Sequence, residues 1–283
     1  MTGTAHRVRN VPLLHRNQCN NNTNYKGAVK MNITELKKSW LEEEQAAHIH
    51  GWDFSYLDGR FDSSDDDLDW DYRRLILDRL TPKMRILDID TGGGEFLLSL
   101  GHPHGMTAAT EGYPPNVELC RKTLIPLGID FHYWQEGMAL PFGDESFDMV
   151  INRHGSYDVQ DLWRVLKKGG VFITQQVGGD NDRELADLLC PGRINPYESH
   201  CLASELEKFT QQGFTIEQSG ECFRPIKFFD TGALVWFARV IPWEFPDFSV
   251  EKNFDRLCVA REMVEKDGCV SGNIHRFMIA AVK

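Results

Sequence analysis

The chain has 283 residues, of which 41% are hydrophobic and 26% are charged, and this balance excludes collagen-like and broadly disordered proteins. Its formal net charge of −11 disfavours a protein that grips a long nucleic acid, because such proteins usually present a basic face. No apolar run reaches the roughly 18 residues of a membrane span. The seven cysteines are scattered singly, so neither a metal site nor a disulfide framework is indicated, and a cytoplasmic protein is expected.

The first 80 residues divide into a tail and a cap. Residues 1–30 carry five basic side chains, no acids and a run of asparagines, so they offer little apolar surface to bury. We expect a disordered tail there, and an RNA-contacting arm is the alternative. Residues 31–80 hold two helical patterns around an aspartate-rich stretch and are expected to form an N-terminal helical cap.

Short apolar strands alternate with helical patterns along residues 81–225, which predicts an α/β core with a mostly parallel sheet and helices on both faces. The candidate strands are Met84–Ile89, Met106–Thr110, Ile129–Trp134, Phe147–Asn152, Val171–Gln175, Thr215–Cys222 and Arg276–Val282. Residues 226–270 separate the last two strands and are expected to form an insertion or lid. Residues 271–283 are expected to form the final core strand.

The strongest chemical signal is the segment 86–96, in which an apolar strand runs into Asp88 and a glycine-rich turn then opens a helix. Glycine lets the backbone approach a ligand closely, and a helix start offers free N–H groups to an anion such as an amino-acid carboxylate. The next strand ends at Glu111, about 20 residues further on, where an acid suits the hydroxyls of a ribose. Tyr113 follows and can pack on an adenine.

A third group of residues completes a family pattern. Glu136–Phe142 is followed by Phe147-Asp148, and then by a leucine-rich helix that ends at Leu166–Gly170. With the two motifs before it, the region from about 85 to 176 resembles the class I S-adenosylmethionine-dependent methyltransferases, and among them the methyltransferase type 11 group. The resemblance implies a Rossmann-like sheet of seven strands with the last one reversed, and S-adenosylmethionine as cofactor.

The resemblance also implies roles for particular residues. The implied cofactor-binding residues are Asp88, Asp90, Gly92, Gly94, Glu111, Gly112, Tyr113, Glu136, Gly137, Met138, Asn152 and Arg153. His154, at a strand end, and Glu244, in an aromatic segment, are the candidate general bases for an acceptor that must lose a proton. The expected reaction is methyl transfer to a small-molecule acceptor.

One position departs from the family pattern, because Asp90 stands where the pattern has glycine. Its side chain adds bulk and a negative charge near the cofactor's carboxylate, so we expect it to weaken cofactor binding. A cofactor-binding protein without catalysis is therefore one alternative. An RNA-base methyltransferase is another, favoured by the basic tail and opposed by the net charge of the chain.

Overall fold

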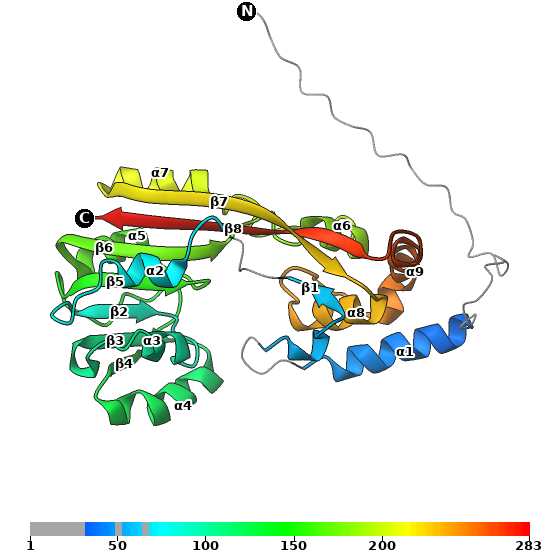
Figure 1. The fold of residues 1–283 in the computed structure, drawn as a ribbon, viewed down its shortest axis with the longest axis horizontal. Helices are drawn as coiled ribbons and strands as arrows, with labels where there is room; N and C mark the ends of the chain where they lie inside the picture. The colour runs from blue at the N-terminus through cyan, green and yellow to red at the C-terminus, as the bar shows by residue number, and fades with distance from the viewer. Residues whose placement is uncertain (1–31, 49–52, 64–67) are drawn as a thin grey trace, which may run out of the picture.

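The structure is a computed structural model that describes residues 32–48, 53–63 and 68–283, so the expected tail at residues 1–30 lies outside it. Two lobes stand side by side in Figure 1, a sheet-containing core lobe and a smaller helical lobe. They are joined by a ribbon of two long strands, β7 (Thr215–Phe228) and β8 (Val270–Val282), which run out of the core sheet and into the helical lobe.

All strands belong to one sheet in the order β1-β7-β8-β6-β5-β2-β3-β4. The remaining strands are β1 (Phe61–Asp62), β2 (Ile86–Ile89), β3 (Thr107–Glu111), β4 (Asp130–Tyr133), β5 (Phe147–Arg153) and β6 (Leu166–Val177). Strands β4, β3, β2, β5 and β6 are parallel, and β8 is antiparallel to both of its neighbours, which confirms the reversed last strand. The sequence predicted seven strands. The eighth, β1, has only two residues, too few to show a period.

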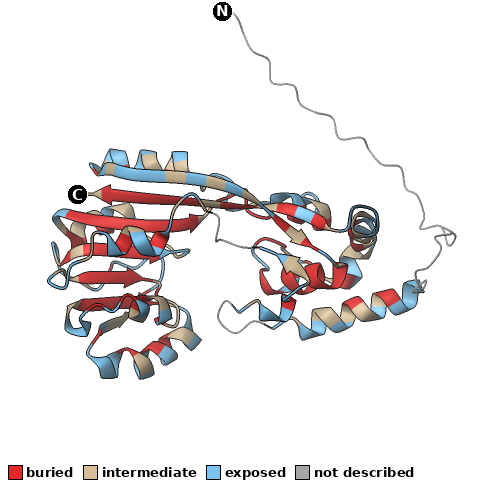
Figure 2. Cartoon of the chain, in the orientation of Figure 1, coloured by how far each residue is buried: buried red, intermediate tan, exposed pale blue. Residues whose placement is uncertain are grey.

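Helices cover both faces of the core sheet. One face packs on α5 (Val159–Val165) and α7 (Leu202–Gln212). The other packs on α2 (Tyr72–Leu77), α3 (Glu95–Ser99) and α4 (Pro114–Thr123). The central strands are therefore buried on both sides, as Figure 2 shows, and this is why their sequences are continuous apolar runs.

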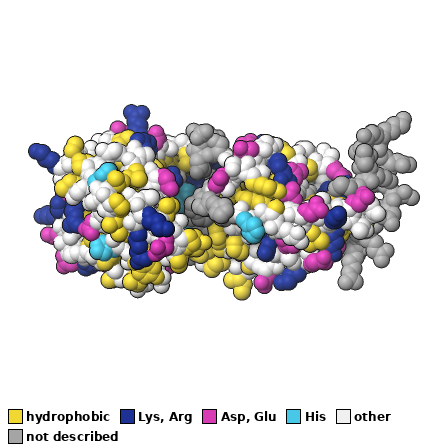
Figure 3. All heavy atoms as spheres, turned by 90° about the horizontal axis from the view of Figure 1, so that it is seen from below, with side chains coloured by type: hydrophobic (Ala, Val, Ile, Leu, Met, Phe, Trp, Pro, Cys, Tyr) yellow, Lys and Arg dark blue, Asp and Glu magenta, His cyan; other side chains and the backbone are white. Residues whose placement is uncertain are grey.

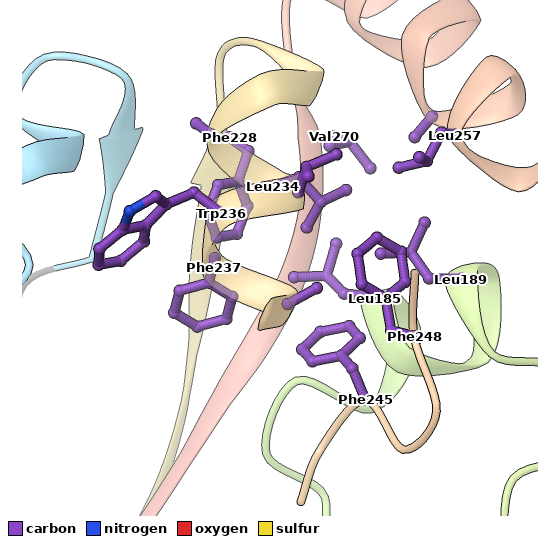
Figure 4. Packing of buried hydrophobic residues seen from close by; sticks show 14 of the residues in the cluster. Leu185, Leu189, Phe228, Leu234, Trp236, Phe237, Phe245, Phe248, Leu257 and Val270 are labelled. Carbon is purple, nitrogen blue, oxygen red and sulfur yellow. The ribbon is translucent and has the colours of Figure 1, made fainter. Parts of the chain in front are cut away.

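The helical lobe has a hydrophobic core of its own. It is built from α1 (Ile33–Ala46), α6 (Arg183–Leu189), α8 (Thr231–Val240) and α9 (Val250–Asp267), together with the outer end of the ribbon. In Figure 4, Leu234 of α8 lies beside Val270 and faces Leu185 and Leu189, whereas Trp236 points to the other side of the helix. Helix α8 is apolar on nearly every face, and such a helix must be surrounded by protein.

The lobes do not follow the segments expected from the sequence. The expected cap at residues 31–80 is divided, because α1 packs on α8 and α9 whereas α2 packs on the core sheet. The expected insertion at 226–270 is most of the helical lobe. Within it α9 was not predicted, because few of its residues are buried and Asn253 interrupts its helical geometry.

The carboxyl ends of β2 and β6 point toward the helical lobe in Figure 1. In open α/β sheets, ligands bind outside these ends. A ligand-binding site is therefore expected at these strand ends, on the side of the core lobe that faces the helical lobe. Within residues 32–48, 53–63 and 68–283, no helix is long and apolar enough to cross a bilayer. The same ranges contain no cluster of potential metal ligands.

Candidate functional site

The glycine-rich turn after β2 is held in a shape that needs glycine. Gly92 and Gly94 have φ of 65° and 87°, in the left-handed region that side chains disfavour. A Cβ on Gly94 would lie 2.8 Å from the Leu124 side chain. Before the turn, Asp88 is buried and accepts a hydrogen bond of 2.6 Å from the Thr91 hydroxyl. Thr91 fixes the turn to β3 by donating its N–H to the Thr110 carbonyl.

Asp90 takes part in the turn and does not simply face solvent. Its φ is 55°, a left-handed conformation that Asp adopts more readily than most residues. The Oδ2 atom accepts a hydrogen bond of 3.1 Å from the backbone N–H of Ser156, in the loop after β5. Asp90 therefore ties the glycine-rich turn to that loop. No local sequence pattern points to Ser156, because the contact joins segments 66 residues apart.

Glu111 is fixed by the backbone at the end of β3. Its Oε1 accepts from the N–H groups of Gly112 and Tyr113, both at 2.8 Å, and its Oε2 accepts from Gly92 N–H at 2.7 Å. The Asn116 amide donates to the same Oε2 at 3.5 Å, a long hydrogen bond that a ligand hydroxyl could replace among the roughly four acceptor positions of a carboxylate. A Cβ on Gly112 would lie 2.5 Å from the Trp134 carbonyl oxygen, so this position also requires glycine.

Burial and neighbouring acidic side chains raise the pKa values of two acids in the turn, Asp88 and Asp90. Burial raises the pKa of Asp88 to about 7, and the nearby Asp90 and Glu111 add to the rise, against the Thr91 hydroxyl and Arg153. The pKa of Asp90 also rises to about 7, through burial and then the charges of Glu111 and Glu136. Negative charge thus outweighs positive charge here. A ligand with positive groups would relieve the imbalance.

Exposed apolar side chains border this acidic turn. Tyr113 is 63% exposed and Met138 is 44% exposed, and they follow the neighbouring strands β3 and β4. Between β4 and Met138, Glu136 accepts a hydrogen bond of 3.0 Å from the Ser156 hydroxyl, and Gly137 has a φ of 86°. The structure thus brings the predicted residues of three strand ends to one side of the core lobe.

Asn152 links the ends of three strands instead of pointing freely outward. Its Nδ2 donates to the Ile89 carbonyl of β2 at 2.9 Å. Its Oδ1 accepts from Gln176 of β6 at 2.6 Å. Gln176 also contacts the Gly155 carbonyl. This buried amide network fixes the loop after β5, which carries His154 and Ser156.

A pocket of about 540 Å³ opens beside this loop. It is lined by Leu68, Asp69, Trp70, Asp71, Tyr72, Arg73, Phe96, Arg153 and Gln175. The Arg153 guanidinium lies over the Phe96 ring at 4.9 Å, and the Tyr72 hydroxyl donates to the Asn152 carbonyl at 3.0 Å. The sequence did not predict the contribution of residues 68–73. Their only signal was the pair Trp70 and Tyr72 within an aspartate-rich run.

The two candidate bases belong to different lobes, His154 to the core lobe and Glu244 to the helical lobe. His154 follows β5 with a φ of 61°, and its ring contacts Gln175. Glu244 is buried on the side of the helical lobe and accepts a hydrogen bond of 3.4 Å from Asn181. Burial raises the pKa of Glu244. Within the described ranges no hydrogen bond joins Glu244 to His154 or to the glycine-rich turn.

Comparison with known proteins gives a consistent result. Residues 87–174 match the model of a methyltransferase domain family. The chain is 28% identical over 148 residues to the phthiotriol/phenolphthiotriol dimycocerosates methyltransferase of Mycobacterium tuberculosis, covering 46% of this chain and 50% of that protein. It is 30% identical over 158 residues to the demethylmenaquinone methyltransferase of Roseiflexus castenholzii, covering 50% and 62%. The chain thus spans about half the length of the curated relatives it matches.

Among solved structures, a candidate methyltransferase from Bacillus halodurans superimposes with a TM-score of 0.52 at 20% identity, covering 75% of this chain and 98% of that one. A Deinococcus radiodurans protein of unknown function gives the same TM-score at 14% identity, with coverage of 78% and 90%. At these identities the likeness shows the fold alone.

Proposed function

Because the chain belongs to the class I S-adenosylmethionine-dependent methyltransferase superfamily, we propose that it transfers a methyl group from S-adenosylmethionine to a small-molecule acceptor bound at the carboxyl ends of its core strands. The observation that carries the proposal is the acidic turn formed by Asp88, Asp90 and Glu111, beside glycines that leave room for a ligand. The relatives named for demethylmenaquinone and for phthiotriol support an acceptor that is a small molecule.

The residues of the turn fit this cofactor. Its ammonium and sulfonium groups are positive, and they would meet carboxylic acids whose pKa values are raised by burial and by neighbouring acids. The Glu111 oxygens, held by three backbone N–H groups, would accept hydrogen bonds from the ribose hydroxyls. Tyr113 and Met138 offer apolar surface to an adenine. When bound, the cofactor supplies an electrophilic methyl group.

The pocket beside the turn would hold the acceptor. Trp70, Tyr72 and Phe96 give it aromatic walls, whereas Arg153 and Gln175 contribute polar groups, a mixture typical of small-molecule sites. These walls would align the nucleophile with the methyl group, which is most of what an in-line displacement requires. The face in Figure 3 mixes charges of both signs, so it offers no continuous basic surface to an RNA.

Calorimetry on the full chain tests the cofactor site. We expect S-adenosylmethionine to bind to the full chain. Glu111→Ala should weaken this binding by about 1–3 kcal/mol, and each 1.4 kcal/mol corresponds to a tenfold increase in the dissociation constant. The matched control is Glu118→Ala, on the exposed side of α4, where the acid pairs with Arg121 at 2.6 Å. Absence of binding, or equal affinity of Glu111→Ala with its fold intact, would contradict this assignment of the cofactor site.

Transfer itself needs a separate measurement. We expect a screen of small molecules, with the cofactor present, to find an acceptor that produces S-adenosylhomocysteine. Cofactor binding without product from any acceptor would support the non-catalytic alternative. Product formed only with RNA, with a salt-dependent affinity, would instead support the RNA alternative.

A further inference from the structure

A chain of hydrogen bonds links the segment before α2 to the loop after β5. The Trp70 Nε1 donates to the Oε1 of Gln175 at 2.8 Å. The Nε2 of the same Gln175 lies 3.2 Å from the Nε2 of His154. An indole nitrogen can only donate, so Trp70 fixes which end of the Gln175 amide is oxygen. The amide NH₂ group must then face the imidazole.

This orientation decides where the imidazole carries its proton. An amide NH₂ group can only donate, so the Nε2 of His154 accepts and its lone pair is occupied. A neutral imidazole has one N–H group. With Nε2 as acceptor, the proton resides on Nδ1. The ring therefore presents a donor at Nδ1 and has no free lone pair on either nitrogen.

The surroundings keep this ring neutral and in place. Burial lowers the pKa of His154, and the guanidinium groups of Arg276 on β8 and Arg153 on β5 lower it further. His154 has a φ of 61° and donates its backbone N–H to the Gln175 carbonyl at 2.9 Å. A left-handed residue other than glycine is strained, and such residues cluster at functional sites.

We propose that Trp70 and Gln175 are positioning residues that hold His154 as a neutral Nδ1–H donor, so that His154 has no free ring nitrogen with which to remove a proton from a methyl acceptor. The consequence for the acceptor rests on the proposed function; the position of the proton does not. An acceptor methylated by this chain is then one that needs no proton removal by His154.

The position of the proton can be observed directly on the full chain without cofactor. Long-range ¹⁵N–¹H correlation spectra of the histidine-labelled protein distinguish the two tautomers and the imidazolium. The His154 signal is assigned by its loss in His154→Gln. We expect Nδ1 protonated and Nε2 unprotonated from pH 6 to 8. An Nε2–H tautomer or an imidazolium at pH 7 would overturn the proposal.

Two substitutions test the positioning residues. Gln175→Glu replaces the donor with an acceptor, so Nε2 should become protonated and the pKa of His154 should rise by at least one unit. Trp70→Phe frees the amide to rotate and should give a mixture of tautomers. Trp163→Phe is the matched control, because Trp163 contacts Gly213 and Phe214 on the opposite face of the sheet.

The outcomes separate the two proposals. An unchanged His154 spectrum in folded Gln175→Glu or Trp70→Phe would contradict the positioning role. Should Gln175→Glu not fold, Trp70→Phe decides alone. Cofactor calorimetry on the same samples reports on the proposed function, because it does not depend on the tautomer of His154.

Discussion

Asp88 and Glu205 are both buried carboxylic acids, with 5% and 2% of their surfaces exposed, yet their pKa values move in opposite directions. Burial raises the pKa of Asp88 to about 7. Burial also opposes the charge of Glu205, but hydrogen bonds from His200, Lys208 and Tyr157 outweigh it and lower the pKa to about 2. Lys208 and Tyr157 lie at 2.6 and 2.9 Å from Glu205.

The contrast shows that hydrogen-bond partners, more than burial, decide whether the pKa of a buried carboxylic acid rises or falls. Glu205 joins α7 to the loop after β5 and stabilises the fold when it is charged. Asp88 and Asp90 have no cationic hydrogen-bond partner among the described residues, so their charges cost stability at neutral pH. Buried acids whose charge destabilises the fold indicate a site where a positively charged ligand would compensate that charge.

The largest expected effect is on the stabilising acid. Because the folded pKa of Glu205 lies below its unfolded value near 4.5, its contribution is complete above pH 4.5 and disappears as the pH falls toward 2. Glu205→Gln should thus lower the free energy of unfolding by up to about 3 kcal/mol at pH 7, and by much less near pH 3. Denaturant titrations at both pH values measure this. Glu207→Gln, exposed on the same helix, should change little.

The acid of the turn should behave in the opposite way. The pKa of Asp90 is raised from 3.8 to about 7, so its stability penalty accumulates as the pH rises between these two values and is complete above pH 7. Asp90→Asn keeps an acceptor for the Ser156 N–H, and should raise the free energy of unfolding at pH 8 by about 1 kcal/mol, after allowance for partial exposure. Lower stability of this variant at pH 8 would show that the charge is compensated.

The same substitution tests the expectation drawn from the sequence, in which Asp90 repels the cofactor. Its position beside Asp88 and Glu111 favours attraction of the cofactor's positive groups. We now expect Asp90→Asn to weaken S-adenosylmethionine binding several-fold, and S-adenosylhomocysteine, which lacks the sulfonium charge, to be affected less. Tighter binding of S-adenosylmethionine by this variant would restore the original expectation.

The smallest expected effect is on the pH dependence of cofactor affinity. Asp88 and Asp90 are each partly protonated near pH 7, and a positively charged ligand favours their ionised forms. The affinity of the unmodified chain for S-adenosylmethionine should increase about threefold to tenfold from pH 6 to pH 8. Calorimetry in buffers of different ionisation enthalpy should also detect proton release. Affinity that is flat with pH would mean that neither acid faces the ligand.

Local signals in the sequence predicted the core lobe well. Strands such as Phe147–Asn152 are buried on both faces, so their apolar runs are unbroken, and the glycines at 92 and 94 are required by backbone angles alone. The class I fold, with its reversed last strand, followed from these motifs. These motifs did not indicate the hydrogen-bond partner of each side chain, such as Ser156 for Asp90.

The helical lobe and the pocket depended on contacts between distant segments. Helix α9 has few buried positions, and nothing in its own sequence indicates that it packs against α6 and α8. Trp70 lies 105 residues from the Gln175 that orients it, and the aspartates around it resemble a solvated loop. Glu244 lies among aromatic residues, which suggested a lid, but Phe245 and Phe248 belong to the core of the helical lobe.

The β7–β8 ribbon leaves the sheet before it reaches the helical lobe. Strand β6 pairs with β8 only as far as Arg276, whereas β7 and β8 continue together to Phe228 and Val270. Over that outer stretch the ribbon has no third long strand, and two-stranded ribbons twist more strongly than wider sheets. A change of a few degrees in the twist of this ribbon would move the attached helices relative to the core lobe. Substitutions along a stretch remote from the glycine-rich turn would thus alter the spacing of the two lobes, while the turn itself keeps its shape.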